Sequence, residues 1–97
     1  MGNRFEFADC DYGSANAGAN VTLVASAANT KGIYVRMLNI NSAAAGTCGF
    51  AIGAQDVAIL QNGNLSFEDF YVPANVDFIL KSSAANNKVM CYYKALT

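Results

Sequence analysis

The stretch from Asn64 to Lys81, NLSFEDFYVPANVDFILK, constrains the fold more than any other part of the sequence. It contains two hydrophobic runs, residues 65–72 and 76–80, which are joined through Pro73, the only proline of the chain. Short runs of β-branched and aromatic residues bounded by Asn, Pro and Gly are typical of β-strands. Because proline cannot donate a backbone hydrogen bond to a sheet, we expect Pro73 at the corner between two strands.

The rest of the chain repeats the two-residue alternation of a strand and shows no helical period. Further short strands are expected at residues 5–7, 20–25, 33–41, 48–53, 57–61 and 88–95. About eight short strands with regular turns predict an all-β, single-domain antiparallel β-sandwich, with a jelly roll as its eight-stranded form. The single domain is expected to span residues 1–97, and residues 1–19 are expected to form an N-terminal arm with a loop at 8–19.

Two short motifs give local predictions. Asn62-Gly63 is a strong hairpin signal because both residues tolerate positive φ, so residues 57–61 and 65–72 are expected to be antiparallel neighbours. In residues 48–53, one face of the strand carries only Gly49, Ala51 and Gly53, and we expect another group to approach that backbone closely.

Residues 33–41, IYVRMLNIN, are expected to form a central strand with both faces covered. Strict alternation places four side chains on one face: Ile33, Val35, Met37 and Asn39. It places the other four on the opposite face: Tyr34, Arg36, Leu38 and Ile40. Both faces carry apolar groups, so the second face is the candidate contact with a neighbouring subunit. A Leu38→Asp variant is accordingly expected to abolish assembly and leave the monomer folded.

The composition favours association with other proteins. Of the 97 residues, 54% are hydrophobic and 13% are charged, against a usual charged share of about 25%. A surface with so few charges is often covered by partners. A monomer whose surface is covered by small polar residues is the alternative, and the sequence leaves it open.

Several functional classes are disfavoured. The net charge is −1 and the six basic residues form no run, which argues against binding to nucleic acid or to an anionic membrane. No apolar stretch approaches the roughly 20 residues of a membrane span, and the N-terminus lacks a signal-peptide core. The chain has no histidine, so the commonest general base is absent. We therefore expect no enzyme activity, cofactor or metal, and synthesis in a cytoplasm.

The three cysteines, Cys10, Cys48 and Cys91, are widely spaced and form no CxxC pair. Without histidine they do not match a zinc motif. Reduced thiols buried as small hydrophobic groups are expected. A disulfide between Cys48 and Cys91, joining facing sheets, is the alternative that the sequence cannot decide.

Tyrosines are a further set of candidate binding groups. The chain has five: Tyr12, Tyr34, Tyr71, Tyr92 and Tyr93. Their rings could pack at the edge of the core or in subunit contacts, or they could form a platform on which a sugar stacks. The first interpretation is favoured, because an apolar ring with a polar tip suits both of those environments.

The segments VTLVASAANTKGIYVRMLNIN and LSFEDFYVPANVDFILKSSAANNKVMCYYKAL resemble small β-sandwich structural proteins of tailed bacteriophages. The resemblance covers residues 20–97 and includes a V-P-A-G-type corner, in which Asn75 stands in the glycine position. Asparagine tolerates the left-handed conformation needed there. The resemblance implies a virion component, assembled in the host cytoplasm, that binds other capsid or tail proteins and is usually an oligomer, with a trimer favoured. A capsid decoration or cementing subunit is the leading expectation, and a glycan-binding module of a fibre or tail tip is the alternative.

Overall fold

The structure, a computed structural model, describes residues 6–16, 18–43, 46–84 and 87–97 of the chain. These residues form one short 3-10 helix, η1 (Phe7–Asp9), and eight strands. The strands are β1 (Asp11–Asn16), β2 (Val21–Val24), β3 (Ile33–Ser42), β4 (Cys48–Ile52), β5 (Gln55–Leu60), β6 (Gly63–Val72), β7 (Phe78–Ser82) and β8 (Lys88–Ala95).

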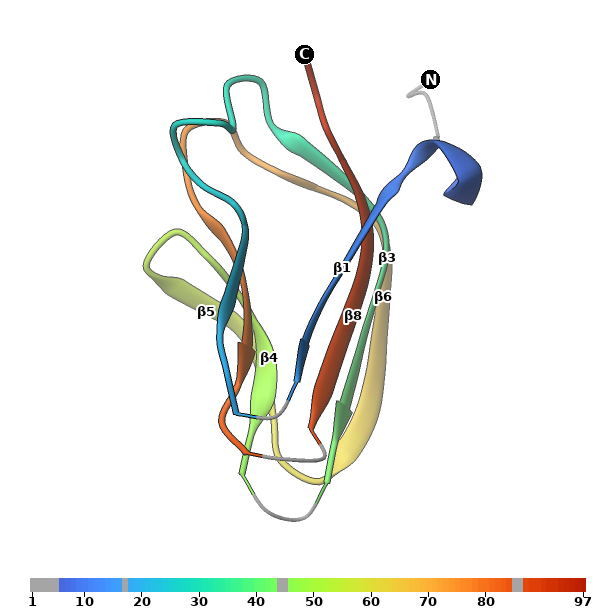
Figure 1. Ribbon diagram of the computed structural model, residues 1–97, viewed down its shortest axis with the longest axis vertical. Helices are drawn as coiled ribbons and strands as arrows, with labels where there is room; N and C mark the ends of the chain where they lie inside the picture. The colour runs from blue at the N-terminus through green and yellow to red at the C-terminus, as the bar shows by residue number, and fades with distance from the viewer. Residues whose placement is uncertain (1–5, 17, 44–45, 85–86) are drawn as a thin grey trace.

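The strands form two facing antiparallel sheets of four strands (Figure 1). The strand order is β1-β8-β3-β6 in one sheet and β2-β7-β4-β5 in the other. The first strand therefore pairs with the eighth, the second with the seventh, the third with the sixth and the fourth with the fifth. A long antiparallel ribbon that starts at the β4–β5 hairpin and rolls into two sheets is a jelly roll. The predicted fold class is confirmed.

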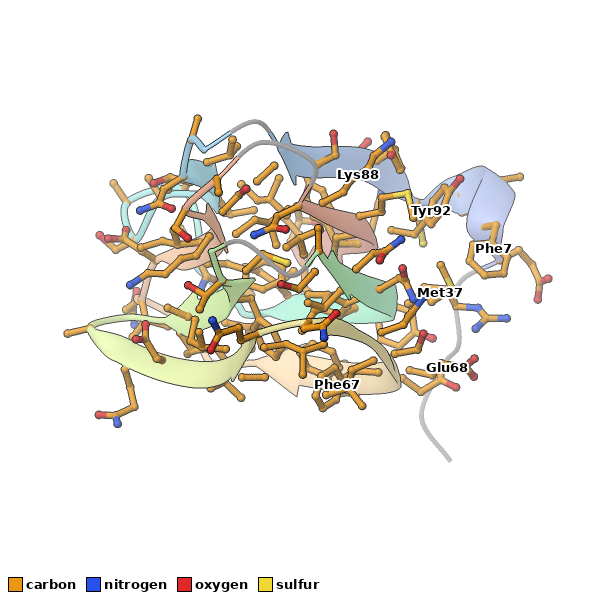
Figure 2. All side chains as sticks on the ribbon, turned by 90° about the horizontal axis from the view of Figure 1, so that it is seen from below. Phe7, Met37, Phe67, Glu68, Lys88 and Tyr92 are labelled. Carbon is orange, nitrogen blue, oxygen red and sulfur yellow. The ribbon has the colours of Figure 1, made fainter. Side chains whose placement is uncertain are left out.

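The core fills the space between the two sheets, where the side chains crowd together in Figure 2. Its centre is the ring of Phe50 on β4. The ring centroids of three other phenylalanines, Phe67, Phe70 and Phe78, lie 5.5, 5.6 and 6.2 Å from that of Phe50. Because Phe67 and Phe70 belong to the opposite sheet, this aromatic cluster joins the two layers.

A β-bulge at Arg36 interrupts the alternation of β3. Val35 lies opposite Tyr93 of β8 and Met37 lies opposite Tyr92, so Arg36 is an extra residue on β3. A bulge shifts the two-residue alternation by one position, and every side chain beyond it changes face.

The predicted contact face of Tyr34, Arg36, Leu38 and Ile40 is therefore wrong. Leu38 and Ile40 come after the bulge, and both are fully buried members of the core. Only Tyr34 and Arg36 remain on the outer side of the sheet. The prediction assumed an unbroken strand, and nothing in the sequence IYVRMLNIN marks the extra residue.

The neighbouring strand β6 is irregular at the same level, where Asp69 has a φ of +54°. Phe67 and Phe70, on either side of the Glu68-Asp69 pair, both pack against the core although they are three residues apart. The hydroxyl of Tyr34 donates a hydrogen bond to the Asp69 carboxylate. Asp69 therefore helps to hold β3 and β6 together.

The predicted loop at residues 8–19 is also wrong, because it contains β1. The sequence of β1, DYGSAN, has few residues that favour strands, and pairing with β8 imposes the conformation. The strand predicted at residues 5–7 is not found at Phe7, which begins η1. Phe5 lies outside the described residues.

The predicted pairing of residues 57–61 with 65–72 is wrong as well. β5 and β6 belong to different sheets, and the chain crosses from one to the other at Asn62, whose φ is +60°. Asn62 thus has the expected left-handed conformation, but it lies where the chain crosses between the two sheets and not in a hairpin turn. The hairpin turn lies instead at Gly53, φ +64°, where Ile52 pairs with Gln55.

The corner at Pro73 is confirmed, since it joins β6 in one sheet to β7 in the other. Asn75 has the expected left-handed conformation, with a φ of +69°. The fully buried Asn29 holds this corner: its Nδ2 donates to the carbonyls of Pro73 (2.8 Å) and Val76 (2.9 Å). Its Oδ1 accepts from the Gly32 amide (2.9 Å), and its own carbonyl accepts from the Asn75 amide (2.7 Å).

Candidate interaction surfaces

The described residues contain no pocket, so the candidate sites are surfaces. Within the same residues, no three His, Cys, Asp or Glu side chains gather as a metal site would require. No helix among them is long and apolar enough to cross a membrane.

The four residues predicted as a contact face do not form a surface together. Leu38 and Ile40 are in the core, and Tyr34 is only 2% exposed. The side chain of Arg36 is 14% exposed and lies 4.0 Å from Asp69. Its guanidinium carbon lies 4.2 Å from the centre of the Phe7 ring, in a cation–π arrangement. η1 therefore covers Arg36 on the outer side of the sheet.

Large exposed hydrophobic side chains instead gather on β5 and β6. Six are exposed in the described part of the chain: Phe7, Tyr12, Val57, Ile59, Leu65 and Tyr71. Four of these six belong to β5 and β6, which lie at the same side of the sandwich as the last strand of each sheet. We call this edge of the sandwich, which carries Val57, Ile59, Leu65 and Tyr71, the β5/β6 side. Its side chains do not share one face: Leu65 lies at the open edge between the sheets, whereas Ile59 and Tyr71 lie on the outer faces of the two opposite sheets.

The open edge between the two sheets explains much of this exposure. Leu65 pairs with the buried Ile40 and points the same way, yet it is 41% exposed because no strand in the described part of the chain lies beyond β6. Phe67 of β6 and Leu60 of β5 are half-buried at the same margin, and Phe67 is labelled there in Figure 2. The core thus reaches the surface between β5 and β6.

The β5/β6 side carries three carboxylates, Asp56, Glu68 and Asp69, and two of them lie beside cations: Asp56 beside Lys81 and Asp69 beside Arg36. The carboxylate of Asp56 forms an ion pair with Lys81 at 2.8 Å, and the Asp56 side chain is 52% exposed. Glu68 is exposed on the outer face of β6, next to Asp69. Exposed apolar side chains beside the carboxylate of Glu68 are suited to a protein surface that offers apolar and basic groups.

Sequence reasoning missed Ile59 and Leu65. A signal was available in residues 57–60, where apolar side chains occupy both faces of the strand, just as in residues 33–41. Apolar side chains on both faces thus occur in two strands, at residues 33–41 and 57–60. The exposed strand is the shorter of the two, at the edge of its sheet.

A second exposed cluster lies on the outer face of the β1-β8-β3-β6 sheet, near η1. The ring of Tyr92 lies 5.0 Å from Phe7 and 5.1 Å from Tyr12, with interplanar angles of 80° and 56°. Figure 2 shows Phe7, Met37 and Tyr92 together on this side of the sheet. The rings pack against one another at steep angles, so they do not present one flat stacking surface.

The tyrosines do not combine into a platform for a sugar. Only Tyr12 and Tyr71 are largely exposed, at 50% and 54%. They lie on β1 and β6, the two opposite edges of one sheet, which are separated by about 14 Å at the usual strand spacing. Tyr34 and Tyr93 have packing roles, as the favoured interpretation expects. The arrangement of the tyrosines does not support the sugar-binding interpretation.

All three cysteines are free thiols, as expected. Cys48 and Cys91 are buried in the core as expected, whereas Cys10 is partly exposed, so the expectation of burial is wrong for this thiol. Burial raises the pKa of Cys91 to about 12. Burial and the nearby Asp9 carboxylate raise the pKa of Cys10. Neither thiol is activated as a nucleophile, which would require a lowered pKa.

Comparisons of the chain with protein-family models, with curated proteins and with solved structures found no match.

Proposed function

We propose that this protein is a structural subunit of a bacteriophage virion, a capsid decoration or cementing subunit that binds other capsid or tail proteins. The observation that carries the proposal is the group of exposed apolar side chains on the β5/β6 side of a chain with only 13% charged residues. The fold is compatible with this function, because the jelly roll recurs in viral capsid proteins. The sequence resemblance to phage structural proteins supports it independently.

The β5/β6 side is the surface that makes the contact. Burying Ile59 and Leu65 against a partner removes apolar area from water, which contributes about 25 cal/mol per Å² before the entropy cost of association is subtracted. Acidic groups beside these side chains favour a partner with basic residues and set the orientation.

The composition of purified particles tests this function. Particles from a host that expresses the chain, purified through a density gradient, are expected to contain it at a fixed ratio to the main shell protein, measured by quantitative mass spectrometry. A chain that remains entirely in the unassembled fraction, while particles form normally, contradicts the proposal.

The glycan-binding alternative receives less support, because the exposed tyrosines lie at opposite sheet edges. It makes a distinct prediction that the same material can test. Saturable binding on a glycan array, lost on Tyr12→Ala, would replace the structural function with that of a fibre or tail-tip module.

A further inference from the structure

The four edge strands of the sandwich differ in how well they are protected from pairing with another chain. Edge strands expose unpaired backbone groups, and natural proteins block them with bulges, charges or proline. β2 has a register shift between Thr22 and Val24, and β5 has one opposite Phe50 and Ala51. β6 is distorted at Asp69, whose φ is +54°, and it carries two adjacent carboxylates.

β1 has none of these protections. It pairs with β8 through six consecutive residues without a register shift. Its sequence contains no proline and a single charge, Asp11, at its first position. It is the outermost strand of its sheet, and its other edge faces the viewer in Figure 1 without a neighbouring strand among the described residues. β1 is therefore the edge best suited to receive a further strand.

We propose that β1 pairs antiparallel with β1 of a second copy of this chain, about a two-fold axis, and so joins the two β1-β8-β3-β6 sheets into one. Residues directly opposite in an antiparallel pair share a face, so the axis passes at a residue in the middle of the strand, Gly13 or Ser14. A two-fold axis is the commonest symmetry of protein oligomers and uses the same surface on both copies.

The charge pattern of β1 fits a second copy. With the axis at Gly13, Asp11 lies opposite Ala15 of the second copy, and with the axis at Ser14 it lies beyond the end of that copy's β1. The two Asp11 carboxylates are then at least four residues apart along the strand, about 13 Å. The same operation on β6 would bring the Glu68 side chains of both copies within two residues of each other. β1 can thus pair with itself, whereas β6 repels its own copy.

The exposed aromatic ring on β1 adds to the contact. Tyr12 is 50% exposed and lies on the outer face, where Ser14 also lies. With the axis at Gly13, each Tyr12 ring lies over Ser14 of the other copy, and its exposed side is covered. The dimer does not depend on the virion function, and it replaces the trimer that the sequence resemblance favours.

Light scattering across a dilution series tests the dimer. The mass of the wild-type chain is expected to rise with concentration toward twice that of the 10.2 kDa monomer. Ser14→Lys and Ser14→Glu are each expected to remain monomeric, because like charges meet beside the axis. An equimolar mixture of the two is expected to regain the doubled mass, because Lys then lies beside Glu. Thr22→Lys, exposed on β2, is the matched control and should leave the dimer intact.

A wild-type chain that stays monomeric at all concentrations overturns the proposal. So does a dimer that survives both Ser14 variants, or a mixture that stays monomeric. If the variants do not fold, hydrogen exchange of the wild type decides the matter. Protection of the amides of residues 11–16 should increase with concentration, and unchanged protection overturns the proposal.

Discussion

Gly49 shows how the absence of a side chain at one residue lets two strands come close together. A Cβ atom at this position would lie 1.8 Å from the carbonyl oxygen of Ala58 on β5, far inside contact distance. The sequence prediction that some group comes close to this backbone is confirmed, and the group is the neighbouring strand. The approach occurs beside the bulge of β5, where the register shifts between Phe50 and Ala51.

Gly49→Ala is therefore expected to destabilise the fold by about 3 kcal/mol or more, because backbone must move to admit the methyl group. Gly63→Ala is the matched control, since its nearest neighbour would be the Leu60 side chain at 3.6 Å, an ordinary contact. Urea unfolding of both variants measures the difference. Equal midpoints for the two would show that β4 and β5 are not as close as described.

The buried thiol of Cys91 predicts how stability depends on pH. Its pKa is raised from 9.0 to about 12 by burial. A group whose pKa is raised by folding favours the folded state fully below its unfolded pKa, and this contribution is lost as the pH rises toward the folded pKa. We expect the free energy of unfolding to fall above pH 9 by about 1.4 kcal/mol per pH unit from this thiol.

Urea unfolding at several pH values between 9 and 11 measures this slope. In Cys91→Ala the slope should be smaller, although not zero, because burial also raises the pKa of Tyr93. Identical slopes in wild type and variant would mean that Cys91 ionises equally easily in both states.

At the scale of elements, the bulge at Arg36 decides which face of β3 meets the core. Residues 33–35 follow the alternation read from the sequence, and residues 37–42 follow the opposite one. A pattern of period two gives the strand and its boundaries, but it cannot reveal an extra residue when both faces are apolar. For this reason the strand was predictable, and the surface built on it was not.

Leu38→Asp is expected to unfold the monomer, because it places a carboxylate among fully buried apolar side chains at a cost of more than about 4 kcal/mol. Met37→Asp, on the outer face beside Tyr92, is the neighbouring control and should cost about 1 kcal/mol. Circular dichroism at 25 °C distinguishes the two. If the Leu38→Asp protein is folded, Leu38 lies on the outer face of β3, as strict alternation predicts, and not in the core.

Other elements show the same limit of sequence reasoning. Six of the eight strands could be located from alternation, along with the corner at Pro73, because these signals are local. β7 was placed two residues early, at 76–80, and β1 was missed, because DYGSAN becomes a strand only through its pairing with β8. The pairing of β5 was wrong because Asn62 has the same left-handed conformation in a hairpin turn as in a crossing between sheets.

At the scale of the whole molecule, the accessible surface is 5211 Å², close to the about 5,300 Å² expected of a folded monomer of this mass. The folded chain is therefore as compact as other monomers of its mass, although its core reaches the surface between β5 and β6. A partner would bind a surface that the folded monomer already presents. This separates folding from assembly and allows variants of the β5/β6 side to be tested as folded proteins.

The most direct test of the account is the amount of this chain bound per purified particle, compared for wild type, Ile59→Asp and Thr22→Asp. Ile59 and Thr22 are both exposed on the β2-β7-β4-β5 sheet, but only Ile59 belongs to the β5/β6 side. We expect Ile59→Asp to reduce binding at least tenfold, the effect of about 1.4 kcal/mol, and Thr22→Asp to bind as wild type, with both proteins folded. Equal occupancy for all three proteins would contradict the assignment of the β5/β6 side as the contact.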